Sequence, residues 1–298
     1  IRTPLPTHRD GVIQRLIDER LVERTARGLV IRRIGALLLA RRLADFPEVD
    51  RKAPRLIVYE GCDKLRTRVD EMMQGGLAVT FREFIRLVVS HLPRYQVIEN
   101  GLRVDRTLVP ESMVRELVAN AIIHQDLTVA GARVMVEIYR DRVEISNPGV
   151  PVMPADRFID GYQSRNEQMA DLMRRMGICE EKGSGVDRVV DAAEGALLPA
   201  PDFRVGVQRT TAVAFGPRGF DQMDREERVR ACYQHACLRW VTNRFMTNQS
   251  LRDRFGLPEA KTAIVSQVIA AAVDLGRVKA DERVGTSRKL ARYIPFWA

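Results

Sequence analysis

The feature that most constrains the fold is a nearly apolar helix, "RELVANAIIHQD" at residues 115–126, which carries a single polar line. At about 100° per residue, Glu116, Asn120 and His124 fall within about 80° of one another. Apolar side chains cover the opposite side of the helix. Burying an unpaired polar group costs about 1–3 kcal/mol, so the polar line needs partners. These are either protein groups or a ligand with a metal ion.

Helical and extended patterns alternate around this helix and predict an α+β fold. Residues 10–44 read as a helix, a short hairpin and a helix. Strands are expected at 54–61, within 100–110, as a pair in 132–149 and as a hairpin in 203–217; helices are expected at 80–92 and 166–177. Residues 148–165 contain three prolines and two glycines and predict a long loop of the kind that often forms a lid.

The C-terminal residues predict a winged helix. A helix at 227–240 is followed by a short helix capped near Thr247 or Asn248 and a longer helix that opens on Pro258. Two strands around a glycine-containing turn then follow in 277–294. Residues 221–298 carry 14 Lys and Arg against 9 Asp and Glu, which favours contact with an acidic partner.

Composition sets limits on partners and compartment. The 298 residues have a formal net charge of +9 and favour nucleic acid as a partner. No apolar run reaches the length of a membrane span. The four cysteines have no disulfide-framework spacing, which predicts the reducing cytoplasm. The chain starts at Ile1, so we expect a fragment that lacks upstream domains.

Three short motifs recur in one order and carry the chemistry. They are Glu-x-x-x-Asn on the helix, a strand that ends "SNPG", and "GSG" before a helix. Each motif is weak alone: "NPG" is ordinary turn chemistry, and "GSG" is as often a plain helix start as an anion site. Their order, with sheet strands between them, makes a stronger case. A G-x-x-x-x-G-K-[ST] motif is absent from the sequence, which argues against a P-loop helicase.

With these motifs, the sequence resembles the Bergerat-fold (GHKL-type) ATPases. Over "RELVANAIIHQD", "VEISNPG" and "SRNEQMADLMRRMGICEEKGSGVDRVV" it is similar to the bacterial RecG-like transcriptional regulators. In that family a Schlafen-type (Alba-like) DNA-binding domain usually precedes the ATPase-like domain and a winged helix often follows; we expect this chain to be a fragment without that upstream domain. The resemblance implies an α/β sandwich, a mixed sheet covered by helices, with a C-terminal winged helix.

The resemblance also implies residue roles. Asn120 would bind the Mg²⁺ that bridges the phosphates of ATP, and Glu116 would be the general base for water. Asn147 and Gly149 would contact adenine, and the second glycine motif, Gly183, Ser184 and Gly185, would approach phosphate with its backbone N–H groups. Asn147 stands where the superfamily has an aspartate, and the lid is poor in glycine; both departures weaken hydrolysis more than binding. His124 and Asp126 fit a structural helix end better than a catalytic pair.

Together these patterns predict four segments: an N-terminal helical or winged-helix-like segment at 1–45, an ATP-binding domain at 46–216, a linker at 217–224 and a winged helix at 225–298. The candidate DNA-contacting side chains are Lys261, Thr262, Ser266, Gln267, Arg283, Arg288 and Lys289. We expect a cytoplasmic, homodimeric regulator without a membrane partner, in which ATP occupancy modulates binding to double-stranded DNA. Alternatives are an ATP-hydrolysing enzyme that acts on DNA and a non-catalytic interaction module with a degenerate pocket.

Overall fold

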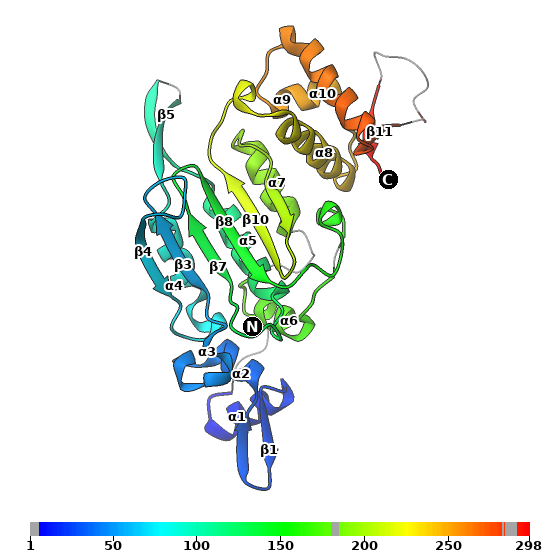
Figure 1. The fold of residues 1–298 in the computed structure, drawn as a ribbon. Coiled ribbons are helices and arrows are strands. Elements are labelled where there is room, and N and C mark those ends of the chain that lie inside the picture. The colour runs from blue at the N-terminus through cyan, green and yellow to red at the C-terminus, as the bar shows by residue number, and fades with distance from the viewer. Residues whose placement is uncertain (1–5, 100, 162, 180–184, 282, 284–290) are drawn as a thin grey trace.

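The computed structural model describes residues 6–99, 101–161, 163–179, 185–281, 283 and 291–298. Figure 1 shows an N-terminal unit at one end, a central sheet covered by helices, and a C-terminal helical unit packed against the far end of the sheet layer. The first and last parts of the chain therefore lie at opposite ends of the molecule.

A six-stranded mixed sheet forms the centre, in the order β4-β3-β7-β8-β10-β9. Its strands are β3 (Arg55–Tyr59), β4 (Thr67–Met72), β7 (Met135–Ile138), β8 (Arg142–Pro148), β9 (Asp202–Val205) and β10 (Arg209–Phe215). Only β3 and β7 pair in parallel among these neighbours, and the other pairs are antiparallel. A parallel pair needs a crossover connection, and the segment between β3 and β7 supplies two long helices.

Helices α4 (Leu77–Ser90), α5 (Glu111–His124) and α7 (Gly185–Gly195) cover one face of this sheet (Figure 1). Val136, Ile138 and Ile145 point to that face and join the helices in one apolar cluster. Strand alternation turns Glu137 to the opposite face. The result is an α/β sandwich with a mixed sheet, as the sequence predicted.

The quoted stretch forms the helix α5, as the sequence predicted. It begins earlier than the quoted stretch, at Glu111, and ends at His124. Pro110 is its N-cap residue, with ψ of 140°. Nine of its residues are buried, Glu116 among them. A helix buried to this extent lies inside a layer, which fits its apolar composition.

The N-terminal unit contains the predicted helix, hairpin and helix: α1 (Arg9–Asp18), β1 (Val22–Thr25), β2 (Gly28–Ile31) and α2 (Arg33–Leu39). It continues through η1 (Leu43–Asp45) and α3 (Pro47–Asp50). Leu37 and Leu38 of α2 are buried in the same cluster as the sheet. Packing therefore continues across the predicted boundary at residue 45, because α2 contacts α4.

A second hairpin, β5 (Arg94–Glu99) and β6 (Leu102–Thr107), projects from the sandwich between α4 and α5 (Figure 1). The sequence predicted β6 but neither β5 nor β4. Strand β4 is an edge strand whose residues are mostly exposed, so its side chains show no apolar alternation. Ile98 and Leu102 of the hairpin are 77% and 70% exposed.

The C-terminal unit contains three helices followed by an antiparallel strand pair. Its elements are η3 (Phe220–Gln222), α8 (Arg225–Val241), α9 (Asn248–Arg254), η4 (Glu259–Lys261), α10 (Thr262–Asp274), β11 (Val278–Ala280) and β12 (Tyr293–Pro295). Thr247 caps α9 through a hydrogen bond from the Ser250 N–H, as its sequence predicted. Residues 284–290, where the glycine-containing turn was expected, lie outside the described residues.

The apolar cluster of the C-terminal unit also contains residues from the central part of the chain. Ile159, Val190 and Ala200, all from the central part of the chain, are buried in its cluster. The predicted linker at 217–224 is packed as well, because Phe220 and Met223 are 7% and 5% exposed. Among the described helices, none is both long enough and apolar enough to cross a bilayer.

Candidate functional site

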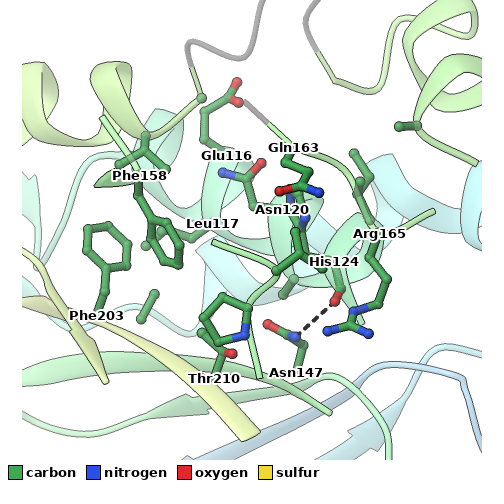
Figure 2. A pocket seen from close by; sticks show the side chains of 18 of the residues that line it. Glu116, Leu117, Asn120, His124, Asn147, Phe158, Gln163, Arg165, Phe203 and Thr210 are labelled. Atoms are coloured by element: carbon green, nitrogen blue, oxygen red, sulfur yellow. Dashed lines mark hydrogen bonds between the residues drawn. The ribbon is translucent and has the colours of Figure 1, made fainter. Parts of the chain in front are cut away.

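A pocket of about 150 Å³ lies along the polar line of α5 (Figure 2). Its walls come from α5, the end of β8, residues 151–165, α6 (Glu167–Arg175), the start of α7, β9 and β10. An engineered apolar cavity of about this volume holds benzene, so the enclosed part of the pocket suits one aromatic ring system.

Glu116, Asn120 and His124 all line this pocket. Figure 2 shows them in succession along α5, with Asn147 beyond His124. The apolar side of α5 packs in the core, so the helix can present its polar line only here. The question that the sequence raises therefore has a structural answer: the line faces a cavity.

Gly185, the first residue of α7, lies directly against this polar line. A Cβ atom at this position would be 3.1 Å from Asn120 Nδ2 and 3.3 Å from Glu116 Oε2. A side chain would therefore crowd both groups. Because Gly185 has no side chain, the backbone at the start of α7 can approach Asn120 closely. The start of a helix also presents unpaired N–H groups that favour an anion.

Asn147 lies at the other end of the polar line, 7% exposed, near the end of β8. Its Nδ2 donates to the carbonyl oxygens of Pro148 at 3.1 Å and His124 at 3.4 Å. Two acceptors on one side fix the orientation of the amide, because only the NH₂ group can donate to them. The Oδ1 atom is consequently turned toward the pocket as an acceptor (Figure 2).

The turn after Asn147 is held by hydrogen bonds on both sides. Gly149 has φ of +96°, and a Cβ atom there would be 2.7 Å from the Cβ of Asp126. Its N–H donates to the Gln208 carbonyl and its own carbonyl accepts from Thr210 Oγ1, both at 2.8 Å. Glycine is required here by both the backbone angle and the close approach.

His124 and Asp126 do not form a catalytic pair among the described residues. Asp126 accepts from the N–H and Oγ1 of Thr128, at 2.9 and 2.6 Å, and pairs with Arg165 at 3.3 Å. The Thr128 hydrogen bonds lower the pKa of Asp126. Burial, followed by the charge of Arg165, lowers the pKa of His124, so its imidazole is neutral at pH 7. The structural role favoured by the sequence fits these contacts.

Glu116 has a partner that the sequence did not indicate. Its Oε1 atom accepts from Arg115 Nη2 at 2.9 Å, and the side chain of Glu116 is 5% exposed. The guanidinium thus engages one oxygen of the carboxylate. The arrangement can hold a cation or orient water.

The apolar wall of the pocket was missed in the sequence. It includes Phe158 and Phe203, whose rings meet edge to face at 5.4 Å. Cys179 also lines the pocket, and burial together with the charge of Glu116 raises the pKa of its thiol to about 11. The sequence indicated this wall only through the long loop at 148–165 that contains Pro and Gly. That loop predicted a lid over the site but not which side chains would line it.

Asn166 is the residue before α6, but its side chain does not cap that helix. Its Nδ2 donates instead to the carbonyls of Ile123 and Gln125, at 2.7 and 2.8 Å. These carbonyls belong to the end of α5 and the residue after it, so Asn166 ties α6 to the base of the pocket. Gly183 and Ser184 of the second glycine motif lie outside the described residues.

The candidate DNA-contacting residues lie away from the pocket in the C-terminal unit. Lys261, Thr262, Ser266 and Gln267 are exposed at the start of α10 and just before it, although the Ser266 hydroxyl accepts from Asn248 at 2.9 Å. Arg283 is ion-paired with Asp281 at 2.7 Å, so its guanidinium is already engaged. Arg288 and Lys289 lie outside the described residues.

One known protein family matches part of the chain. Residues 131–214 match the family described as "Putative ATP-dependent DNA helicase recG C-terminal". The chain contains a RecG-like, ATPase-like region. The match includes Asn147, Gly149 and Gly185 but begins after Glu116 and Asn120, and it covers less than a third of the chain. A search of curated proteins gave no match.

The fold is similar to that in a crystal structure of the DIP2311 protein from Corynebacterium diphtheriae, with a TM-score of 0.58 and 18% identity. The similarity covers 86% of this chain and 52% of that protein, so this chain spans about half the length of its structural relative. At this identity the comparison shows a shared fold.

Proposed function

We propose that this chain is a cytoplasmic, homodimeric regulator that binds ATP with Mg²⁺ in a Bergerat-type fold and double-stranded DNA through a C-terminal winged helix. In this proposal nucleotide occupancy modulates DNA binding. The matched RecG-like region supports an ATPase-like domain. The observation that carries the nucleotide proposal is the placement of Asn120 under the start of α7, with the acceptor of Asn147 at the other end of the same pocket.

The residues fit Mg²⁺ and phosphate at the Asn120 end. An amide oxygen is a hard ligand of the type that Mg²⁺ accepts, and Asn120 carries one without a competing negative charge. The absence of a side chain at Gly185 leaves room against Asn120. When bound, Mg²⁺ would neutralise and orient the phosphates of the nucleotide. Asn120 would hold the ion, and the first turn of α7 would face the phosphates.

The Asn147 end suits an aromatic base with an amino group. Oδ1 is fixed as an acceptor by the two carbonyls that hold Nδ2. Ile145 and Phe158 supply apolar surface in the same pocket. An adenine ring would find both a wall to pack on and an acceptor for its exocyclic amine, which supports ATP as the ligand.

We favour a sensor over an enzyme because of Arg115. Its Nη2 donates to Oε1 of Glu116 at 2.9 Å, so one oxygen of the candidate general base is engaged by a neighbouring side chain instead of the attacking water. An ATP-hydrolysing enzyme that acts on DNA remains the second candidate, because Glu116 lines the same pocket one helical turn from Asn120. In a sensor Glu116 positions water and charge, and turnover is negligible.

The DNA part of the proposal rests on the order of three helices and a strand pair, and on the exposed polar start of α10. Lys261 and Gln267 are placed to contact phosphate and base edges. The +5 charge of residues 221–298 adds a sequence-independent attraction for DNA.

A titration of the full chain with a fluorescent ATP analogue, with and without Mg²⁺, tests the nucleotide site. Asn120→Ala should lose the Mg²⁺-dependent affinity, whereas Gln249→Ala, an exposed amide on α9, should bind as the parent does. Duplex-DNA anisotropy with a non-hydrolysable analogue then tests regulation, and phosphate release tests turnover. A parent protein that binds no nucleotide would refute the proposal in favour of an interaction module. Steady release that disappears in Glu116→Ala would establish the enzyme.

A further inference from the structure

Residues 150–161 form one wall of the pocket and contact the C-terminal unit on their other side. Phe158 lines the pocket and packs against Phe203. The next residue, Ile159, is 5% exposed and lies in the apolar cluster of the C-terminal unit. Two consecutive side chains of one backbone segment thus belong to two different parts of the molecule.

Polar contacts tie the same segment to the C-terminal unit. The hydroxyl of Tyr233 on α8 donates to the carbonyl of Asp156. The Trp297 Nε1–H donates to that hydroxyl at 3.1 Å, so it directs the Tyr233 proton toward Asp156. Arg277 pairs with the Asp156 carboxylate at 3.6 Å, and the Arg157 guanidinium lies 4.7 Å from the centre of the Trp297 ring.

The segment has little regular structure of its own to hold it. Its one helical element is the three-residue 3₁₀ turn η2 (Ala155–Arg157). So short a turn has few internal hydrogen bonds, and its position depends on outside contacts. The contacts with Tyr233, Trp297 and the apolar cluster therefore act together with the Phe203 contact to place Phe158 against the pocket.

The helix α7 connects the same two parts. Its first residue lies against Asn120 and Glu116 in the pocket. Near its other end, Glu194 accepts from His235 Nδ1 on α8 at 2.9 Å and pairs with Arg254 of α9 at 3.3 Å. Arg254 also donates to the Leu198 carbonyl at 2.7 Å, beyond the end of α7. The C-terminal unit thus contacts two walls of the pocket.

We propose that Tyr233 and Trp297 are positioning residues of the pocket, through which the C-terminal unit sets the affinity for nucleotide. The inference rests on the proposed nucleotide site. Tyr233 and Trp297 hold the backbone of residues 155–159. This backbone places the Phe158 ring where it packs on the ligand. Coupling of this kind is reciprocal. If a DNA duplex shifts the C-terminal unit and so changes the affinity for nucleotide by some factor, then nucleotide changes the affinity for DNA by the same factor.

The test uses the full chain and two conservative variants, Tyr233→Phe and Trp297→Phe. The first removes the hydroxyl and the second removes the indole donor, and both keep an aromatic ring. Ile269→Val is the matched control, because Ile269 of α10 is buried in the same apolar cluster. Three quantities are measured: the melting temperature, the Kd for the fluorescent ATP analogue with Mg²⁺, and amide hydrogen exchange over residues 150–161 without nucleotide.

We expect both aromatic variants to melt close to the parent and to bind nucleotide about three- to tenfold more weakly, the loss expected for about one hydrogen bond. The amides of Arg157, Phe158 and Gly161, which form hydrogen bonds within the segment, should exchange faster. Ile269→Val should lower the melting temperature without either change.

Two results would overturn the inference. One is unchanged exchange over 150–161 in both aromatic variants. The other is an equal loss of nucleotide affinity in Ile269→Val, which would mark a general effect of stability. If the parent binds no nucleotide, the proposed function fails, while the exchange measurement still decides whether Tyr233 and Trp297 position this segment.

Discussion

Asn147→Asp is the most informative single substitution in the pocket, because related ATPases are expected to carry aspartate at this place. Here the Nδ2 atom of Asn147 donates to two carbonyl oxygens, at 3.1 and 3.4 Å, and the residue is 7% exposed. A carboxylate would lose both hydrogen bonds, about 1 kcal/mol each, and would place a charged oxygen against two carbonyl dipoles. At pH values above the pKa of the new carboxyl group, the free energy of unfolding is lower by about 2–4 kcal/mol.

The sign of the pH dependence follows from burial. Burial and the two carbonyls raise the pKa of the introduced aspartic acid above its unfolded value, because they disfavour its charged form. The destabilisation is therefore small at low pH, where the group is protonated in both states, and it grows as the pH rises through the folded-state pKa. The full destabilisation corresponds to a loss of roughly 5–10 °C in melting temperature.

Asn147→Leu is the matched control, since leucine has a similar shape but no charge and no donor. It should cost about 1–2 kcal/mol, the value of the lost hydrogen bonds, with no pH dependence of its own. Thermal melts of the parent and both variants at pH 4 and pH 8 separate the two effects. An aspartate variant as stable as the parent at pH 8, or an equal penalty at both pH values, would refute the fixed amide orientation.

Further predictions concern the pocket, α7 and the DNA surface. Asn120→Ala should abolish the Mg²⁺-dependent part of nucleotide affinity while the protein still melts in one cooperative transition; unchanged affinity by calorimetry would remove Asn120 from the site. Gly185→Ala should weaken nucleotide binding several-fold because its Cβ would be 3.1 Å from the Asn120 amide, which a titration would measure. Burial and the nearby charge of Asp160 raise the pKa of Asp187 to about 6, so this carboxylate destabilises the fold increasingly as the pH rises from about 4 to 6 and fully above 6. Asp187→Asn should thus stabilise by about 1 kcal/mol at pH 7.5, after allowance for partial exposure, and not at pH 4, as urea unfolding would show. Lys261→Ala should reduce the slope of log affinity against log salt for duplex DNA by about 1 if this lysine contacts phosphate.

The elements with strong apolar periodicity could be predicted from the sequence. The helix α5 and the strands β7 and β8 bury nearly every apolar position, so their patterns are complete. The strands β4 and β5 could not be predicted in the same way. Strand β4 lies at the sheet edge and β5 in a projecting hairpin, where partner strands rather than side-chain burial determine the extended backbone.

The candidate site divides along a similar line. Its polar residues could be found because Glu116 and Asn120 share a helix face and Gly185 belongs to a short motif. The apolar wall could not, because Phe158 comes from an irregular loop and Phe203 from a short strand, and neither has a period. The hydrogen-bond partners of Arg115 and Asn166 could not be predicted from the sequence either, because they depend on side-chain rotamers and on contacts between distant segments.

The burial of Ile159, Val190 and Ala200 in the C-terminal cluster bears on how such a chain can be recombined. A domain with a closed core can be exchanged for another along with its linker, because the exchange exposes little apolar surface. Here a foreign C-terminal domain would also have to bury Ile159 and provide contacts for Glu194 near the end of α7. We therefore expect the C-terminal unit to diverge in step with residues 150–201, and chimaeras joined at residues 217–224 to express poorly unless both sides of this contact come from the same parent.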